Sequence, residues 1–201
     1  MPASKTRELK TELRSELCRK AIHILIALVP ALAALNFHNT ALLLMAGVLV
    51  YASTEIMRFL GFSLPIISTF TAAVSRKREK DGFAIGPVTL GLGAFLTLVL
   101  FPPQVAAAAI YTLAFGDSAA CLAGKYLGRI RPVFLAGKSI EGSLACFLVS
   151  ALVTWLVFHD WKTAAAVGFA AALIDALPFK DFDNLLMPLA AGAAAIIILN
   201  C

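Results

Sequence analysis

The feature that most constrains this chain is a succession of seven apolar runs separated by short polar breaks. The runs cover residues 21–35, 41–58, 84–101, 105–124, 141–158, 162–177 and 185–200. A helix that crosses a bilayer needs about 20 mainly apolar residues, so these runs occupy most of the 201 residues. They leave no stretch long enough for an independent soluble domain. We therefore predict an all-α fold, a polytopic membrane bundle of about seven transmembrane helices.

The composition excludes a water-soluble globular protein. Hydrophobic residues make up 60% of the chain and charged residues 14%, whereas soluble domains are about half apolar and about a quarter charged. The net charge of +5 does not indicate nucleic-acid binding, because the basic residues lie in small groups beside the apolar runs, as membrane topology requires. With the N-terminus in the cytoplasm, every Lys and Arg except Lys162 falls on the cytoplasmic side. This distribution predicts an integral, multi-pass protein, located in a prokaryote in the plasma or inner membrane.

Two segments are expected to lie along the membrane rather than cross it. Residues 1–20 carry charges of both signs around three leucines spaced four apart, which predicts an amphipathic helix at the cytoplasmic interface. Residues 64–74 are apolar but too short to span, so an interfacial or re-entrant piece is expected there. Residues 21–201 are predicted to form one transmembrane domain.

The acidic side chains of that domain gather on the same side as the basic ones, although no topological rule requires it. A carboxylate inside the membrane costs about 2.5–3.5 kcal/mol, so it needs a partner or a function. Several carboxylates beside several bases suit a site for a metal ion and a polyphosphate. The acidic residues predicted at this face are Glu55, Glu79, Asp81, Asp117, Glu141, Asp175, Asp181 and Asp183, whereas Asp160 faces outward.

Asp117 lies late in an apolar run directly after Gly116, where a glycine lets a ligand or another backbone come close. Contact with a metal or substrate is favoured there over an ion pair that serves packing alone. Downstream, Lys125 and Arg129 stand one helical turn apart and can face a common phosphate. A solvated basic helix end is the alternative for these two residues.

The segment GKSIEGS at 137–143 opens the fifth apolar run. Free backbone N–H groups at a helix start attract anions, the glycines permit close approach, and Lys138 adds a positive charge. The segment is not a Walker A loop, because that motif needs a glycine where Pro132 stands. Ser139 can also be an ordinary N-cap.

Three further groups are candidates at the same face. Asp175 ends the sixth run, and the DFDN turn at 181–184 precedes the seventh; Mg²⁺ typically takes one or two carboxylates together with phosphate oxygens and water. Where the chain first enters the membrane, four polar side chains share one side of the helix, namely Glu16, Arg19, Lys20 and His23, and a purely topological role is the alternative for these charges. The basic cluster at 76–80, which contains Glu79, suits lipid headgroups or nucleotide phosphates. Glu55 and Arg58 are expected to form a structural ion pair.

Together these segments resemble the CTP-dependent polyprenol kinase family, which includes dolichol kinase, phytol kinase and a related CTP-dependent diacylglycerol kinase. The resemblance implies transfer of the γ-phosphate of CTP to a lipid alcohol (a polyprenol, dolichol, phytol or diacylglycerol), with CDP as the other product and Mg²⁺ as cofactor. The segments that carry it are RKxxH at 19–23, Glu79 with Gly86-Pro87, GDxxA at 116–120 with Gly124-Lys125 and Gly128, GKSIEGS, and DFDN with Pro188.

The resemblance also implies roles for the candidate residues. Asp117 and Asp183, together with Glu141, would hold Mg²⁺, and Asp117 or Asp175 would accept the proton of the alcohol, a choice that stays open. The nucleotide would be bound by Lys125, Arg129, Gly137, Lys138, Ser139, Gly142 and Asn184. The many small residues in the apolar helices permit a homodimer and close contact with membrane lipids.

Two other functions compete with the kinase. A cytidylyltransferase of the CDP-diacylglycerol synthase type has similar Asp and Lys-Thr-x-Glu-Gly segments, but this chain lacks the terminal His-Gly-Gly-x-x-Asp-Arg-x-Asp signature. A non-enzymatic transporter would be expected to carry charges nearer the bilayer midplane and a repeated half. Neither feature is visible in the sequence.

Overall fold

The computed structural model describes residues 19–62, 83–132, 135 and 137–200. In these parts the regular structure is entirely helical, which confirms the predicted all-α class. Residues 19–26 form one helical segment. The other elements are α2 (Val29–Leu35), α3 (Phe37–Phe59), α5 (Gly86–Leu100), α6 (Pro103–Tyr111), a π-helical turn η2 (Thr112–Gly116), α7 (Asp117–Tyr126), α8 (Ile140–Phe158), α9 (Trp161–Ala176), a 3-10 turn η4 (Lys180–Phe182) and α10 (Asp183–Leu199).

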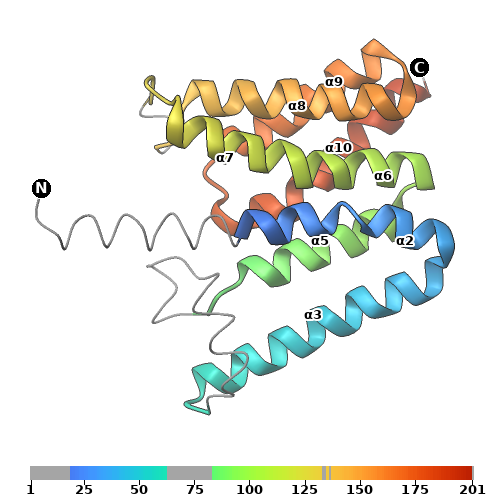
Figure 1. Ribbon diagram of the computed structural model, residues 1–201, viewed down its shortest axis with the longest axis vertical. Helices are drawn as coiled ribbons and strands as arrows, with labels where there is room; N and C mark the ends of the chain where they lie inside the picture. Colours follow the sequence, from blue (N-terminus) through green and yellow to red (C-terminus); the bar gives the residue numbers. More distant parts are fainter. Residues whose placement is uncertain (1–18, 63–82, 133–134, 136, 201) are drawn as a thin grey trace, which may run out of the picture.

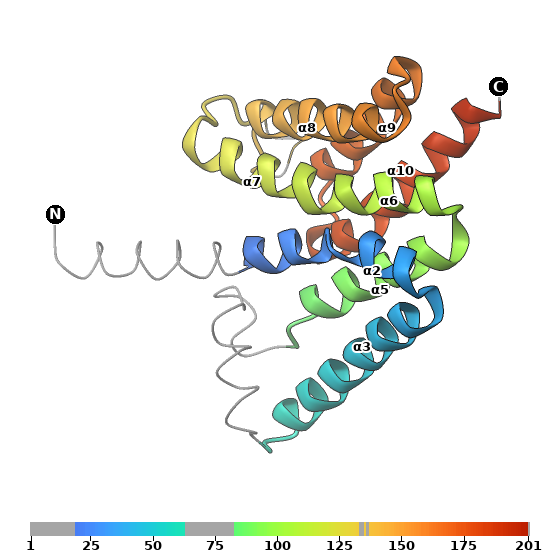
Figure 2. The same cartoon turned by 45° about the vertical axis from the view of Figure 1, so that its right-hand side comes forward.

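Successive passes of the chain cross the view of Figure 1 in alternating directions, so that one end of the bundle collects the ends of many elements. Helix α8 packs on α9 and α7, α9 packs on α10, and α10 packs on α5. Helix α3 contacts α5 but diverges from the other helices in both views (Figures 1 and 2). As a result, the chain segments that follow residues 18, 126 and 176 lie near one another at one end of the bundle. The α2–α3 turn lies at the other end.

Small residues bring the helices of the core close together. One core cluster consists of Val105, Ala109, Val167, Ala191 and Ala195. Such packing is expected of helices in lipid, which associate through close van der Waals contact rather than through the hydrophobic effect.

Polar caps and prolines fix the breaks between helices. Helix α3 begins at Phe37, four residues earlier than the predicted run, because the side chain of Asn36 accepts a hydrogen bond from the backbone N–H of Asn39 at 3.0 Å. Asp160 caps α9 through the backbone N–H and hydroxyl of Thr163, and these hydrogen bonds lower the pKa of the Asp160 carboxyl. The cap is therefore intact at neutral pH and is lost only as the pH falls through that lowered pKa.

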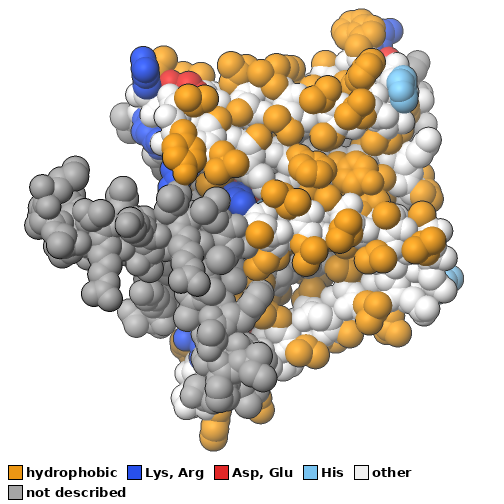
Figure 3. All heavy atoms as spheres, in the orientation of Figure 1, with side chains coloured by type: hydrophobic (Ala, Val, Ile, Leu, Met, Phe, Trp, Pro, Cys, Tyr) orange, Lys and Arg blue, Asp and Glu red, His pale blue; other side chains and the backbone are white. Residues whose placement is uncertain are grey.

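The outer surface of the described chain is apolar, as a lipid-facing surface should be. Hydrophobic side chains are spread over the described part of the face in Figure 3, whereas most of the blue basic side chains lie toward its left side. On α3, for example, Leu42 and Leu43 are 69% and 72% exposed. A soluble protein does not expose a contiguous apolar surface of this kind.

Three described helical stretches are long and apolar enough to cross a membrane, fewer than the seven predicted spans. They are Phe37–Phe59, Pro103–Tyr126 and Ile140–Phe158. Gly86–Leu100 and Asp183–Leu199 are apolar but shorter, and the first run is interrupted at residues 27–28 ahead of a proline near the start of α2. Fewer described helices are long enough to span the membrane than predicted, because some of the apolar runs are interrupted and others form short helices. The predicted helix at 1–20, apart from its last two residues, and the predicted interfacial segment at 64–74 lie outside the described residues.

We predict that Gly93→Ala lowers the melting temperature of the purified protein. A Cβ atom at Gly93 would lie 2.5 Å from the carbonyl oxygen of Asn184 and force α5 away from α10, which costs about 1–3 kcal/mol of unfolding free energy. The matched control is Gly47→Ala on α3, where a Cβ meets nothing within 4 Å. Thermal unfolding in detergent measures both, and equal melting temperatures would contradict the close approach of α5 and α10.

Candidate active site

A cavity of about 220 Å³ opens at the end of the bundle where the charged segments meet. Its walls come from the helical segment at 19–26, α7, the loop before α8, and the facing ends of α9 and α10. Three carboxylates and four basic side chains line it: Asp117, Asp175, Asp183, Lys20, Lys125, Arg131 and Lys138. Residues up to 163 positions apart in sequence, Lys20 and Asp183, thus share one small space.

Asp117 is held at the cavity by two partners from the first helical segment. Its Oδ2 atom accepts a hydrogen bond from Nζ of Lys20 and lies 2.8 Å from Nδ1 of His23. The side chains of Lys20 and Asp117 are only 6% and 14% exposed. Both contacts use Oδ2, and within the described chain no contact is recorded for Oδ1. A buried ion pair of this kind keeps the carboxylate ionised without occupying both of its oxygens.

The local backbone explains how Asp117 reaches this position. The π-helical turn at 112–116 directly precedes it, and such turns rotate the following residues relative to an uninterrupted helix. Gly116 lies against α8, where a Cβ atom would stand 2.3 Å from Oγ of Ser150. The sequence therefore needs glycine here for the close packing of this turn against α8.

Lys138 links two carboxylates on the opposite side of the cavity. Its ammonium group donates to the backbone carbonyl of Asp175, lies 3.3 Å from Oδ1 of that residue, and lies 3.5 Å from Oδ2 of Asp183. The hydroxyl of Ser143 donates to Oδ2 of Asp175 at 3.1 Å. Asp175, at the end of α9, and Asp183, at the start of α10, are thereby drawn toward the beginning of α8.

The beginning of α8 is a capped helix terminus that borders the cavity. Ser139 is the N-cap, as its sequence position allowed, and accepts from the backbone N–H of Gly142 at 3.1 Å. A Cβ atom at Gly142 would lie 2.9 Å from the carbonyl oxygen of Ala120, so α7 and α8 are in near-backbone contact. Gly137 has φ +91°, a conformation that favours glycine. These glycines bring the positive end of a helix to the cavity wall.

Glu141 and Arg129 are placed outside the cavity lining. The Glu141 carboxylate accepts hydrogen bonds from the backbone N–H groups of Arg129 and Ile130 at 2.9 and 3.1 Å. Glu141 thus anchors the loop after α7. Arg131, which the sequence placed only among the cytoplasmic basic residues, lines the cavity and donates to the carbonyl oxygens of Gly137 and Gly124. Its position depends on a loop conformation that no spacing rule predicts.

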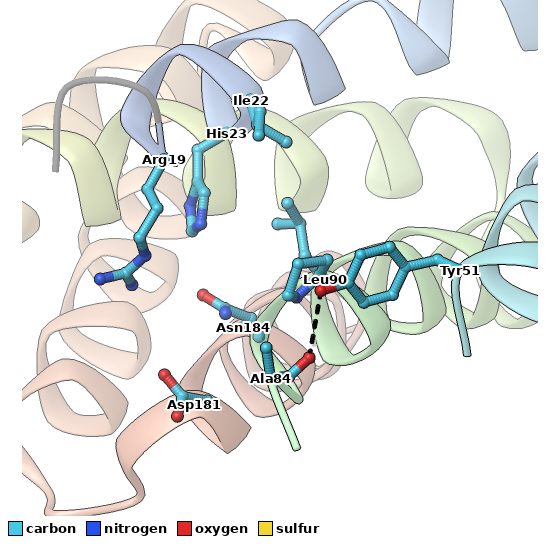
Figure 4. A pocket seen from close by; sticks show the side chains of 10 residues that line it. Arg19, Ile22, His23, Tyr51, Ala84, Leu90, Asp181 and Asn184 are labelled. Carbon is cyan, nitrogen blue, oxygen red and sulfur yellow. Dashed lines mark hydrogen bonds between the residues drawn. The ribbon is translucent and has the colours of Figure 1, made fainter. Parts of the chain in front are cut away.

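A second, smaller pocket of about 20 Å³ is lined by residues that include His23 (Figure 4). Arg19, His23, Asp181 and Asn184 are arranged around it, so Asn184 lies here rather than on the larger cavity. His23 borders this pocket and also contacts Asp117, which borders the larger cavity. The His23–Asp117 contact therefore connects the walls of the two cavities.

The predicted ion pair of Glu55 and Arg58 is present and serves the scaffold. The Glu55 carboxylate is fully buried and accepts two bonds from the guanidinium of Arg58, at 2.9 and 2.7 Å, and one from the backbone N–H of Ala84, at 2.8 Å. This fastens the end of α3 to the residues before α5. Glu79 lies outside the described residues.

Within the described residues, no three His, Cys, Asp or Glu side chains converge into a ready-made metal site. The residues nevertheless fit Mg²⁺ that arrives with a nucleotide. Such an ion typically takes only one or two protein carboxylates and completes its shell with phosphate oxygens and water. Three carboxylates lining one cavity meet that requirement.

Comparison with known proteins identifies relatives that act on lipids. The chain is 34% identical over 149 residues to the phytol kinase of Synechocystis sp., covering 68% of this chain and 60% of that protein. It is 24% identical over 141 residues to the CTP-dependent diacylglycerol kinase 1 of Schizosaccharomyces pombe, covering 62% of this chain and 64% of that protein. An uncharacterized protein of Rickettsia prowazekii is 27% identical over 190 residues, covering 85% of this chain and 88% of that protein.

No protein-family model and no solved structure matches the chain. The relatives nonetheless confirm the resemblance drawn from the sequence: the chain is similar to lipid kinases that include phytol kinase and CTP-dependent diacylglycerol kinase. It spans about 60% of the length of the phytol kinase and 64% of that of the fission-yeast kinase.

We predict that Glu141→Gln retains most of the turnover, because an amide oxygen can accept the same two backbone hydrogen bonds. Glu141→Ala removes both bonds and should lower the melting temperature. Steady-state kinetics and thermal unfolding of the two variants provide the measurement. A loss of turnover by orders of magnitude in Glu141→Gln would contradict the anchoring role and favour the metal ligand that the sequence suggested.

Proposed function

We propose that this protein is a membrane kinase that transfers the γ-phosphate of CTP to a lipid alcohol. The observation that carries the proposal is the cavity in which Asp117, Lys138 and Asp183 meet at one end of an apolar bundle. Phosphoryl transfer needs positioning and charge neutralisation more than it needs covalent chemistry. A cavity with charges of both signs, next to lipid-facing helices, lets a hydrated nucleotide meet an acceptor dissolved in the membrane.

The triphosphate would lie against the basic side of the cavity. Lys138, Lys125 and Arg131 supply positive charge there, and the capped N-terminus of α8 supplies backbone N–H groups and the helix dipole. Lys138 is paired with Asp175 and Asp183 before the nucleotide binds. On binding, the lysine would turn to phosphate oxygens and release the two carboxylates.

Asp117 and Asp183 are the carboxylates that would hold Mg²⁺ together with the phosphates. Bound there, the ion would neutralise the charge that develops on the transferred and leaving phosphates. Lys20 and His23 hold the Asp117 carboxylate in place through Oδ2. Asp175 is the other acidic group within the cavity, held by Lys138 and Ser143.

The reaction exchanges one phosphorus–oxygen bond for another. The oxygen of the acceptor hydroxyl bonds to the γ-phosphorus, the bond between that phosphorus and the β–γ bridging oxygen breaks, and CDP leaves. The hydroxyl proton passes to a carboxylate of the cavity, Asp117 or Asp175. The acceptor is a lipid alcohol of the polyprenol, dolichol, phytol or diacylglycerol class.

The membrane placement that fits this chemistry puts the cavity at the cytoplasmic face, where CTP is available. The basic residues predicted to be cytoplasmic include those lining the cavity, while Lys162 lies in the first turn of α9 at the far end of the bundle. We therefore propose a multi-pass protein with its N-terminus in the cytoplasm and with the shorter apolar helices also embedded. A homodimer is compatible with this arrangement.

Labelled CTP separates the kinase from its two competitors. With purified protein, Mg²⁺ and a panel of polyprenols, phytol and diacylglycerol, a kinase moves γ-label into the organic-soluble product. A cytidylyltransferase moves α-label, and a transporter moves neither. Incorporation of α-label without γ-label would contradict the proposal.

We predict that Asp117→Asn reduces kcat by at least about 10³-fold, equivalent to about 4 kcal/mol in the activation barrier, in protein that is still folded and inserted but has a lower melting temperature, because buried Lys20 loses its charged partner. The neutral amide can neither bind Mg²⁺ well nor accept the proton. The matched control is Asp160→Asn at the opposite end, where asparagine also caps a helix. Full turnover of Asp117→Asn would remove Asp117 from the mechanism.

A further inference from the structure

A second large cavity, of about 750 Å³, lies toward the end of the bundle opposite the charged cavity. It is bounded by α2 and the start of α3 on one side, by α6 on the other, and by the ends of α5 and α8. Its lining is almost wholly apolar and rich in alanine, including Ala31, Ala34 and Ala107. The cavity is open because these side chains are small; leucine side chains at the same positions would fill it.

The two cavities lie along the same pair of helices. The chain segment at 19–35 runs side by side with α6 and α7 in both ribbon views (Figures 1 and 2). At one end of this pair Lys20 contacts Asp117, and further along Val29 packs against Ala106 and Ile110. The apolar cavity follows beyond that contact, between α2 and the first turns of α6.

Aromatic side chains continue the apolar surface from the cavity toward Asp117. Tyr111 lines the cavity, and its ring lies 6.2 Å from that of Phe115, which is 36% exposed and stands two residues before Asp117. At 1.5 Å per residue, the cavity begins about 9 Å from Asp117 at Tyr111 and ends about 20 Å away at Gln104. A hydrocarbon chain as long as one leaflet, about 15 Å, would end inside it.

We infer that this apolar cavity holds the hydrocarbon tail of the lipid acceptor while the hydroxyl lies at Asp117. The inference rests on the proposed function and adds to it a binding site for the tail. A single-chain isoprenoid alcohol fits, because its head is small and its tail is one branched chain that follows the groove between two helices. Tail binding would raise the affinity for long acceptors over short ones that share the same head.

Filling the cavity tests the inference. Ala34→Trp and Ala107→Trp place an indole in it, and we expect each to raise the KM for phytol at least tenfold. The KM for CTP should not change, nor should kcat/KM for prenol, which has the same allylic head and no tail to reach the cavity. The control is Ala193→Trp, an exposed alanine of α10 outside the cavity, which should leave all of these values unchanged. An unchanged KM for phytol in both cavity variants would overturn the inference.

A labelling experiment on the unaltered protein decides the question even if the tryptophan variants fail to fold. Phytol carrying a diazirine at its tail end, irradiated with the protein in lipid nanodiscs, should label peptides from α2 and α6, and excess phytol should abolish the labelling. Labelling spread over α3 and α10, or unaffected by excess phytol, would mean ordinary contact with bulk lipid and would overturn the inference. If the protein transfers no phosphate from CTP, the proposed function fails, and labelling still reports on the cavity separately.

Discussion

Pairing of buried charges at one end of an apolar bundle is the constraint on which the rest of this structure depends. Lys20 with Asp117, and Lys138 with Asp175 and Asp183, join segments that are distant in sequence. Removing one partner of a buried pair such as Lys20 and Asp117 typically costs about 3–5 kcal/mol, because the other charge is left without compensation. Each pair therefore helps to fix the end of the bundle where α7, α8, α9 and α10 converge.

The same pairs make the cavity suited to the metal-bound polyphosphate that we propose as its ligand. A ligand of one sign would leave the charges of the other sign unpaired, whereas a nucleotide with Mg²⁺ offers both partners at once. The close backbone contacts at Gly116 and Gly142 hold the helices that carry these charges. In the proposed mechanism, nucleotide binding replaces the ion-pair partners of the cavity residues while the helices keep their positions. The apolar cavity along α2 and α6 brings the acceptor to the same point.

The helices could be predicted from the sequence because their signals are local. The apolar runs, the prolines and the capping side chains Asn36, Ser139 and Asp160 mark where helices begin and end. The gathering of Asp117, Lys138 and Asp183 could be anticipated from the one-sided distribution of charge. The roles of Glu141, Arg131 and Asn184 could not, because they depend on the conformation of residues 127–132 and 137–139 and on the rotation of the first turn of α10. From the sequence alone, a carboxylate near a predicted site can either bind a metal or accept hydrogen bonds from two backbone N–H groups. Only the conformation of the neighbouring loop distinguishes the two roles.

The most direct test of the central claim is a structure of the protein in lipid nanodiscs with Mg²⁺ and a non-hydrolysable CTP analogue. The account predicts the triphosphate in the charged cavity, with its γ-phosphate between Lys138 and Asp117 and with the contacts of Lys138 to Asp175 and Asp183 replaced by contacts to phosphate. A nucleotide bound elsewhere on the protein, or one that leaves both lysine pairs undisturbed, would contradict it.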